Sequence, residues 1–202
     1  MCHLLESICW EKGNMELLDL HINRMNRSRK LLFGINTPIY LAPDLKPPEN
    51  LNHKWKLRII YKKEIEKIEW IPYTKSIPKK VLVLDAGQIN YDFKYAKRES
   101  FEKLKNDHPD FDDFILTRNN FLTDGSYSNL VLKIGDRWLT PSTPLLKGVR
   151  RESLLKKGKI SEHPLKKEHL LMADEIRLIN ALLPLDDAIV LKTDQLFFSK
   201  KA

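Results

Sequence analysis

The sequence predicts an α+β fold, in which pairs of strands are interspersed with separate helices. Segments of alternating apolar and polar residues recur in neighbouring pairs, as antiparallel hairpins require, and stretches of helical periodicity lie between them. The 202 residues fit one domain or two small ones, at roughly 100–200 residues per domain. A break at Pro78 and a turn containing Gly87 predict an N-terminal domain over 1–85 and a C-terminal domain over 86–202.

The first half of the chain predicts one helix among several strands. Around Met25, apolar residues (Leu18, Ile22, Met25, Leu32) recur at helical spacing, and Gly34 stands where a helix commonly stops. A turn at Lys62-Lys63 joins two strand-like runs. The expected elements are a strand over 4–10, a helix over 17–34, an irregular connection over 36–52, a hairpin over 56–61 and 65–70, and a buried strand over 81–85.

The second half predicts further strands and two helices. A turn at Gly135-Asp136 joins two strand-like runs, and Gly148 precedes a stretch with Leu154 and Leu155 on its apolar side. The expected elements are helices over 98–106 and from after Gly148 to Gly158, and strands over 114–117, 129–134, 137–140, 176–179 and 188–191.

The composition excludes several classes of protein. A hydrophobic content of 42% supplies a core and excludes wholesale disorder. No apolar run approaches the roughly 18 residues of a membrane span, and the opening MCHLLESICWEKG lacks the basic region of a signal peptide. We therefore expect a cytoplasmic protein with no membrane partner, in which Cys2 and Cys9 are reduced thiols. No second ligand pair accompanies them at zinc-site spacing, so no metal site is expected.

The charge is strongly basic. Lys+Arg 35 exceed Asp+Glu 27, and the difference of 35 − 27 gives a net charge of +8. Such an excess suits an anionic partner, whether a nucleic acid, a membrane surface or a small ligand. The lysines are spread along the chain in pairs such as Lys62-Lys63 and Lys166-Lys167, which is typical of a solvated surface. Composition alone therefore leaves the anion open.

Three stretches carry residues suited to chemistry. In DAGQINYDFKYAKR, Lys94 lies between aromatic residues and near other cations, a setting that lowers an amine pKa and suits a Schiff-base nucleophile. In LTDGSYSNLVL, a polar turn follows Asp124 and precedes Asn129. In TPSTPLLKGVRRESLL, the helix that Gly148 precedes has exposed N–H groups that, with Arg150, suit a phosphate. Taken singly, the same stretches are more typical of a surface lysine, an ordinary polar turn and a plain loop-to-helix junction.

Taken in order, these motifs resemble the class IV aminotransferase family, the fold-type-IV pyridoxal-phosphate enzymes. The resemblance covers about residues 5–191 and rests on LHINRM, KYAKR, TDGSYSN, TPSTPLLKGVRR and DEIRLINALLP. Within the family the chain is most similar to 4-amino-4-deoxychorismate lyases, chiefly through KYAKR and NALLP. The resemblance implies two small α/β domains. The first is expected to be shortened, because the family's opening strands and a glycine-rich loop after KLRIIY have no counterpart.

The resemblance also assigns roles to residues. Lys94 matches the lysine that forms the Schiff base with the cofactor, and Arg24 matches the arginine that grips the cofactor phosphate. Asp124 stands where most members have a glutamate facing the pyridine nitrogen. Arg58 falls near a substrate-side arginine, and Leu182 lies in a loop on the substrate-carboxylate side. The other residues expected at the cofactor are Asn129, Gly148, Val149, Arg150, Asn180 and Ala181.

Three positions depart from the family pattern. Asp124 is one methylene shorter than glutamate, so the cofactor ring must sit closer or a water must bridge. Arg150 stands where a threonine or serine hydroxyl commonly helps hold phosphate. Ala181 lacks a hydroxyl that some relatives have.

The function that the resemblance implies is a pyridoxal-phosphate-dependent lyase, which passes through a quinonoid and releases pyruvate and 4-aminobenzoate. An aminotransferase of the branched-chain or D-amino-acid type shares the early steps and stays as the alternative. A basic module that binds RNA without catalysis is a more remote alternative, because WKLRIIYKK alternates basic and aromatic residues. The enzyme interpretation implies a small anionic amino substrate and a homodimer, with no nucleic acid.

Overall fold

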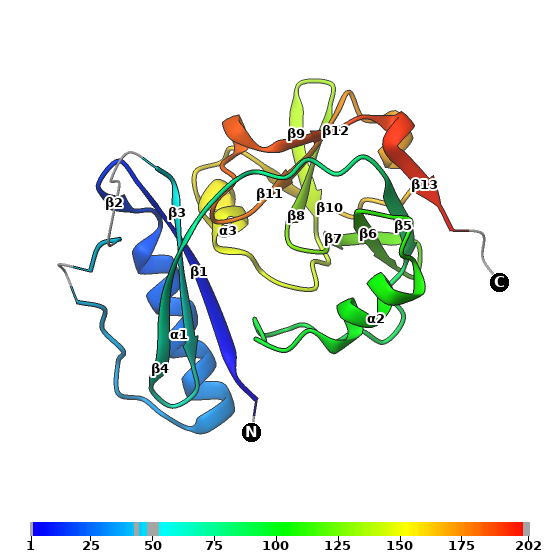
Figure 1. Ribbon diagram of the computed structural model, residues 1–202. Coiled ribbons are helices and arrows are strands. Elements are labelled where there is room, and N and C mark those ends of the chain that lie inside the picture. Colours follow the sequence, from blue (N-terminus) through cyan, green and yellow to red (C-terminus); the bar gives the residue numbers. More distant parts are fainter. Residues whose placement is uncertain (1, 43–44, 48–52, 200–202) are drawn as a thin grey trace. The chain divides into compact units, whose positions relative to one another are not determined.

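The chain folds into two compact units (Figure 1). The computed structural model describes residues 2–42, 45–47 and 53–199. The first unit contains Met1–Lys75 and Phe93–Lys97, and the second contains Ser76–Asp92 and Arg98–Ala202. This division differs from the single boundary expected after residue 85. The segment around residue 81 pairs within the second unit, and the segment around Lys94 pairs within the first.

The first unit is an antiparallel sheet of order β2-β1-β3-β4 with one helix packed on it (Figure 1). Its elements are β1 (Leu4–Glu11), β2 (Asn14–Met15), α1 (Leu18–Phe33), β3 (Trp55–Tyr61) and β4 (Ile65–Pro72). Alternate residues of β1 and β3 point toward α1 and form the core with Met25. The expected strand, helix and hairpin are therefore confirmed. Of the irregular connection expected over 36–52, residues 43–44 and 48–52 lie outside the described part of the chain.

The buried face of α1 is more polar than its apolar spacing predicts. His21, Met25, Ser28 and Arg29 are buried, whereas Ile22 is only half-buried. The polar residues can face inward because the sheet and its turns offer them hydrogen-bond partners. The helix ends as expected at Gly34, which has a φ of 70° and donates its N–H to the Lys30 carbonyl at 3.1 Å.

A short segment from the middle of the chain completes this sheet. The Leu5 N–H donates to the Lys94 carbonyl at 2.8 Å, and the Ala96 N–H donates to the His3 carbonyl at 2.9 Å. Because the other edge of β1 pairs with β3, this segment lies on the same edge as β2. Lys94 is therefore fixed by its main chain to the start of β1.

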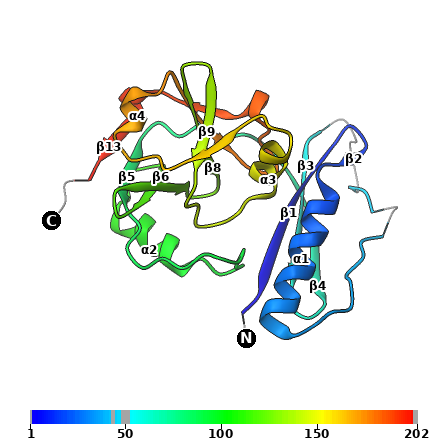
Figure 2. The same ribbon diagram turned by 180° about the vertical axis from the view of Figure 1, so that it is seen from behind.

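The second unit is built around a larger mixed sheet (Figure 2). The strand order is β10-β9-β8-β7-β6-β5-β13, and β11 pairs with both β8 and β12. Its strands are β5 (Val81–Asp85), β6 (Asp113–Arg118), β7 (Phe121–Gly125), β8 (Asn129–Ile134), β9 (Arg137–Pro141), β10 (Ser161–His163), β11 (Glu175–Ile179), β12 (Ile189–Leu191) and β13 (Leu196–Phe198). Its helices are α2 (Glu99–Asp107), α3 (Val149–Lys156) and α4 (His169–Met172), with 3₁₀ turns at Leu185–Asp187 and Thr193–Gln195.

Both helices and all five strands expected after residue 86 are present within a few residues of their expected bounds. Four elements were not expected: β7, β10, α4 and β13. Asp124 and Gly125 are typical turn residues in the sequence, yet they are buried in β7, which lies between β6 and β8. None of the helices in the described residues combines the length and apolar character that crossing a membrane requires.

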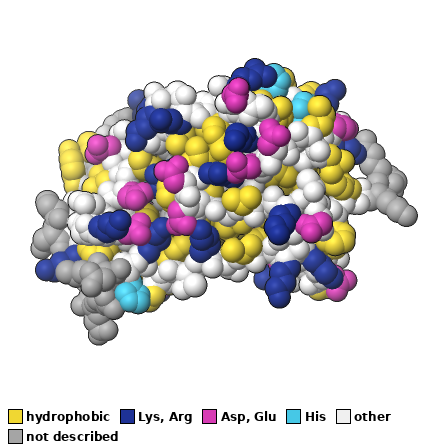
Figure 3. Space-filling model, turned by 90° about the horizontal axis from the view of Figure 1, so that it is seen from above, with side chains coloured by type: hydrophobic (Ala, Val, Ile, Leu, Met, Phe, Trp, Pro, Cys, Tyr) yellow, Lys and Arg dark blue, Asp and Glu magenta, His cyan; other side chains and the backbone are white. Residues whose placement is uncertain are grey.

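Basic and acidic side chains are interspersed on the face shown in Figure 3. Ion pairs also form across neighbouring strands and along helices, such as Lys133 with Glu175 and Lys156 with Glu152. Exposed pairs of this kind are typical of a solvated surface of mixed sign.

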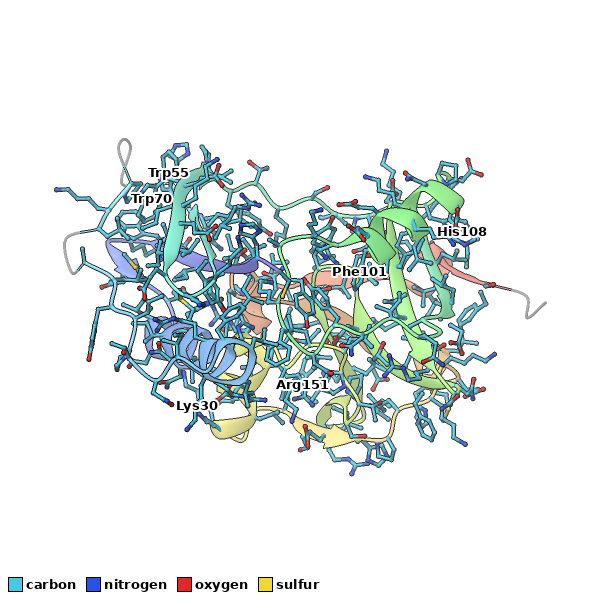
Figure 4. The ribbon with its side chains drawn as sticks, turned by 90° about the horizontal axis from the view of Figure 1, so that it is seen from below. Lys30, Trp55, Trp70, Phe101, His108 and Arg151 are labelled. Atoms are coloured by element: carbon cyan, nitrogen blue, oxygen red, sulfur yellow. The ribbon has the colours of Figure 1, made fainter. Side chains whose placement is uncertain are left out.

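Arg29 provides a test of the first unit's packing. It is 1% exposed, and it donates to the carbonyls of Lys63 at 2.7 Å and Thr37 at 2.5 Å, which joins α1 to the β3–β4 turn. Arg29→Met leaves these carbonyls without their donor, so we expect the free energy of unfolding to fall by about 3 kcal/mol. The neighbouring exposed Lys30 (Figure 4) gives the control, because Lys30→Met should change it by less than about 0.5 kcal/mol. Equal effects of the two variants in urea unfolding would contradict this account.

Candidate active site

The first unit places Lys94 and Arg24 on elements that β1 holds together. Lys94 is half-buried and is bonded through its carbonyl to Leu5. The next residue of β1, Glu6, points toward α1, where Arg24 lies. One strand therefore fixes both of the expected cofactor contacts of this unit.

Glu6 is a fully buried carboxylate that binds two side chains of α1. Arg24 donates from Nε to Oε1 at 2.8 Å and from Nη2 to Oε2 at 2.5 Å, so that one edge of its guanidinium is fixed. His21 Nδ1 lies 2.7 Å from Oε2. His21 Nε2 is also buried and has no hydrogen-bond partner among the described residues.

The protonation states of this cluster follow from its geometry. Burial alone would raise the pKa of Glu6, but the charge of Arg24 and the hydrogen bonds from His21 and Arg24 outweigh it and lower the pKa to about 2. Burial lowers the pKa of His21, and the charges of Arg24 and Lys94 lower it further against the attraction of Glu6. At neutral pH, Glu6 is therefore ionised and His21 is neutral.

Arg58, expected on the substrate side, lies on the opposite face of the sheet from this cluster. Glu6 pairs across the strands with Ile59, whose side chain is buried toward α1, and neighbouring residues of a strand point to opposite faces. Arg58 binds the carboxylate of Glu69 on β4. The structure therefore does not bring Arg58 together with Arg24.

The second unit gathers the other expected residues around the buried carboxylate of Asp124. Asp124 lies in β7, one residue before its end, and pairs with Asn129 at the start of β8. Its Oδ1 accepts from Asn129 Nδ2 at 2.7 Å, and its Oδ2 accepts from the Leu146 N–H at 2.8 Å. Asn129 Nδ2 also donates to the Leu146 carbonyl at 2.9 Å, which closes a ring of hydrogen bonds.

Asp124 has neutral hydrogen-bond donors where Glu6 has a cation. Burial raises the pKa of Asp124 to about 6, although the Leu146 N–H, Asn129 and the charge of Arg151 partly offset it. The carboxylate is thus poised between its two protonation states just below neutral pH. A carboxyl group of this kind suits the exchange or sharing of a proton with a ring nitrogen.

Glycine is required at position 148 because the Asn129 side chain packs directly against its Cα. A Cβ at position 148 would lie 2.0 Å from Asn129 Oδ1, so any larger residue would displace that amide. The φ of Gly148 is −70°, which shows that space and not backbone conformation demands glycine here. Val149 follows and begins α3, whose first turn presents N–H groups that make no bonds within the helix.

Arg150 joins the start of α3 to the turn over residues 180–183. Its Nη2 donates to the Ala181 carbonyl at 2.9 Å, and its Nε lies 3.4 Å from the Asn180 carbonyl. Asn180 Oδ1 accepts from the Leu182 N–H at 2.9 Å, which fixes the turn. Asn129, Gly148 and Val149 thus lie at one end of a linked set that extends through Arg150 to residue 182.

Sequence reasoning missed Glu6 and His21. A charged residue at an inward position of the apolar strand LLESICW was a usable signal, as was a histidine three residues before Arg24. Ser128 was also missed: its hydroxyl is buried and has no hydrogen-bond partner within the described part of the chain. The second unit contains a buried carboxylate, a helix start and the Arg150 side chain, a set that suits an anionic cofactor. The first unit, described by itself, contains the Lys94 amine and the Arg24 guanidinium.

Comparison with known proteins supports this interpretation. The profile of the family described as Amino-transferase class IV matches residues 49–185. An uncharacterized protein of Haemophilus influenzae is 32% identical over 186 residues, which cover 90% of this chain and 98% of the relative.

Solved structures share the fold along nearly the whole chain. A candidate 4-amino-4-deoxychorismate lyase of Haemophilus somnus has a TM-score of 0.77 and 24% identity, covering 92% of this chain and 98% of its own. A candidate amino-acid aminotransferase of Mesorhizobium loti has a TM-score of 0.75 and 18% identity, covering 98% and 100%. A hypothetical aminotransferase of Mycobacterium tuberculosis, with pyridoxal phosphate bound, has a TM-score of 0.72 and 17% identity, covering 96% and 81%. These likenesses confirm the expected fold class.

Glu6→Gln tests the buried ion pair. A pKa lowered from 4.5 to about 2 corresponds to about 3 kcal/mol of stability at pH 7, at roughly 1.4 kcal/mol per unit. Since the folded pKa lies below the unfolded one, this stability is present above pH 4.5 and is lost as the pH falls toward 2. We expect Glu6→Gln to lower the free energy of unfolding at pH 7, and the difference from wild type to shrink in acid.

The matched control is Glu11→Gln on the same strand. Glu11 forms a partly exposed ion pair with Lys54 at 3.5 Å, which contributes less than about 1 kcal/mol. Urea unfolding of both variants and the wild type, at neutral pH and at about pH 3, gives the comparison. A Glu6→Gln effect that stays constant with pH would show that the carboxylate charge is not what stabilises the unit.

Proposed function

Because the chain belongs to the class IV aminotransferase family, we propose that it is a pyridoxal-phosphate-dependent 4-amino-4-deoxychorismate lyase, which releases pyruvate and 4-aminobenzoate. The observation that carries the proposal is the ring of hydrogen bonds that holds the buried Asp124 carboxylate beside the start of α3. A carboxylate and a helix start are what the pyridine nitrogen and the phosphate of this cofactor need.

The residues present fit that cofactor. The absence of a Cβ at Gly148 lets the Asn129 amide pack against the start of α3, and the buried Ser128 hydroxyl, with no partner among the described residues, can serve a bound group. Val149 and Arg150 would bind the phosphate through their N–H groups, with the guanidinium of Arg150 adding positive charge. In the first unit, Arg24 would contribute a further cation, with one edge of its guanidinium fixed on Glu6.

The cofactor supplies a ring that takes up the electrons left when a C–H bond of the amino substrate breaks. Lys94 Nζ would hold the cofactor and would accept the proton from the amine-bearing carbon of the substrate once it is free. Asp124, mostly ionised at neutral pH with its pKa of about 6, would keep the ring nitrogen protonated. The turn over residues 180–183, which Arg150 holds through the carbonyls of Asn180 and Ala181, would receive the substrate carboxylate, with Leu182 on that side.

The lyase is preferred to an aminotransferase because of the motifs KYAKR and NALLP. The similarity to the candidate lyase of Haemophilus somnus over 98% of that protein also supports it. An aminotransferase of the branched-chain or D-amino-acid type is the second candidate, favoured by the similar fold of the Mesorhizobium loti protein. Both reactions use Lys94 and Asp124 in the same way. A homodimer and a small anionic amino substrate are part of the proposal and rest on the resemblance to the family.

The RNA-binding alternative loses its main support. In WKLRIIYKK, Trp55 is 8% exposed and Tyr61 is 1% exposed, because both point into the core of the first unit. Neither ring is available to stack on a base. The alternation of basic and aromatic residues is that of a strand with one buried side.

Lys94→Ala tests the catalytic lysine. With pyridoxal phosphate added, we expect the wild-type protein to show the visible absorbance of a lysine-bound cofactor, and Lys94→Ala to lose it. Turnover should fall by about 10³-fold, because the proton acceptor is gone. Lys97→Ala, an exposed lysine of the same segment, is the control and should keep both properties. A wild-type protein without absorbance or borohydride-trapped cofactor would refute the enzyme proposal.

Two assays separate the candidate reactions. We expect pyruvate and 4-aminobenzoate to form from 4-amino-4-deoxychorismate, because the same proton abstraction precedes loss of the enolpyruvyl group. An amino acid supplied with 2-oxoglutarate should give little glutamate by comparison. Lys94→Ala serves as the blank in both assays. Glutamate formed without pyruvate would overturn the lyase in favour of the aminotransferase.

A further inference from the structure

Arg98 binds the turn between β7 and β8, and neither the resemblance nor the proposed mechanism gives it a role. It directly precedes α2, and its guanidinium carbon lies 4.0 Å from the centre of the Phe101 ring and 4.1 Å from that of Tyr127. Phe101 projects from α2 (Figure 4), and Tyr127 belongs to the turn. The cation is therefore held by one ring from each of two elements.

The polar contact of Arg98 is with the main chain of the same turn. Arg98 Nη2 donates to the Ser126 carbonyl. Its Nε and Nη1 are buried and have no hydrogen-bond partner in the described part of the chain. The rings and one carbonyl therefore fix the guanidinium, and the carboxylate of Asp113 lies near enough to interact with its charge. A lysine offers neither the planar surface for the rings nor the directed N–H.

Asp113 binds the main-chain N–H of Ser126, whereas Arg98 binds its carbonyl. Asp113 Oδ1 accepts from the Ser126 N–H at 3.3 Å and from its neighbour Phe114 N–H at 2.7 Å. The N–H of Ser126 thus meets a carboxylate from β6, and the carbonyl meets a guanidinium from the start of α2. These two contacts, called the Ser126 clamp, fix both main-chain groups of Ser126 through Arg98 and Asp113.

The clamped turn connects segments that the proposed cofactor site uses. Asp124 precedes it and Asn129 follows it, and within it the Gly125 N–H donates to the Ser128 carbonyl at 2.8 Å. The Tyr127 carbonyl accepts from Asn180 Nδ2 at 3.2 Å, which extends the contact to the turn over residues 180–183. A shift of residues 126–127 would therefore move the Asp124–Asn129 pair and the Asn180 side chain together.

We propose that Arg98 is a positioning residue, whose guanidinium, seated between Phe101 and Tyr127, fixes the Ser126 carbonyl and so sets the turn that aligns Asp124, Asn129 and Asn180. The alignment matters for catalysis if the proposed function holds, whereas the clamp itself is a property of the protein without cofactor. A displacement of about 1 Å in such a site costs on the order of 10²-fold in rate.

The first test measures the turn without cofactor, by amide hydrogen exchange in the wild type, Arg98→Met and Arg98→Lys. Met keeps the apolar stem between the rings, and Lys keeps the charge. We expect exchange over residues 122–130 to rise about 10-fold or more in both variants, with α3 and β11 unchanged. The control Lys103→Met removes an exposed cation from α2 and should match the wild type. Unchanged exchange over residues 122–130, or a rise spread evenly over the second unit, would overturn the clamp.

The second test asks whether the clamp acts on the reaction. We expect Arg98→Met and Arg98→Lys to bind pyridoxal phosphate within about 3-fold of wild type, while kcat falls by about 10- to 100-fold. Failure of Lys to rescue kcat shows that the directed contact matters and not the charge. An unchanged kcat, or a loss of cofactor binding equal to the loss of rate, overturns the positioning role. If Arg98→Met does not fold, Tyr127→Leu removes one of the two rings and should raise the same exchange. A wild type that binds no cofactor refutes the proposed function. In that case, amide hydrogen exchange over residues 122–130 still tests whether Arg98 holds the turn.

Discussion

The organisation of the first unit depends on one buried carboxylate, Glu6. An ionised group with 0% exposure needs a cation and hydrogen bonds, and Arg24 and His21 of α1 supply them. The helix must therefore pack with these two residues facing β1, although its apolar spacing alone would turn Ile22 inward. Since the neighbouring Leu5 holds the main chain of Lys94, the same strand positions the proposed catalytic lysine and the proposed phosphate ligand.

The second unit uses a buried carboxylate in the opposite way. Asp124 has neutral donors at short range, and burial raises its pKa to about 6, whereas Arg24 and His21 bring that of Glu6 down to about 2. Glu6 is consequently a fixed charge over the whole physiological range, and Asp124 is sensitive to what binds beside it. This contrast supports a structural role for the first group and a role toward the cofactor ring for the second. The shorter side chain of Asp124 is held in place by Asn129 and Leu146.

Local sequence patterns predicted most elements, because the spacing of apolar residues in a segment reflects which of its side chains are buried in the core. The alternation in β3, the turn after Tyr61 and the stop at Gly34 all appear in the structure at the expected places. The failures share a cause. Strand β7 contains Asp124, which is typical of a turn. It can be buried because Asn129 and the Leu146 N–H donate hydrogen bonds to its carboxylate. The 93–97 segment has no strand signal of its own, and it joins the first unit through hydrogen bonds to β1.

The sequence by itself determined the family and the α+β class, because motifs indicate the first and local periodicity the second. It also supplied the residues that are proposed to carry chemistry. It did not determine which of those residues meet. Glu6 finds Arg24 across 18 positions, Arg150 finds Ala181 across 31, and Arg98 finds Ser126 across 28. Such contacts depend on the order of the strands and on the face of the sheet or helix to which each side chain points. A buried charge or carbonyl group therefore meets its partner only when the chain has folded. The same constraint put Arg58 and Glu6 on opposite faces of one sheet, although nothing in their local sequence separates them.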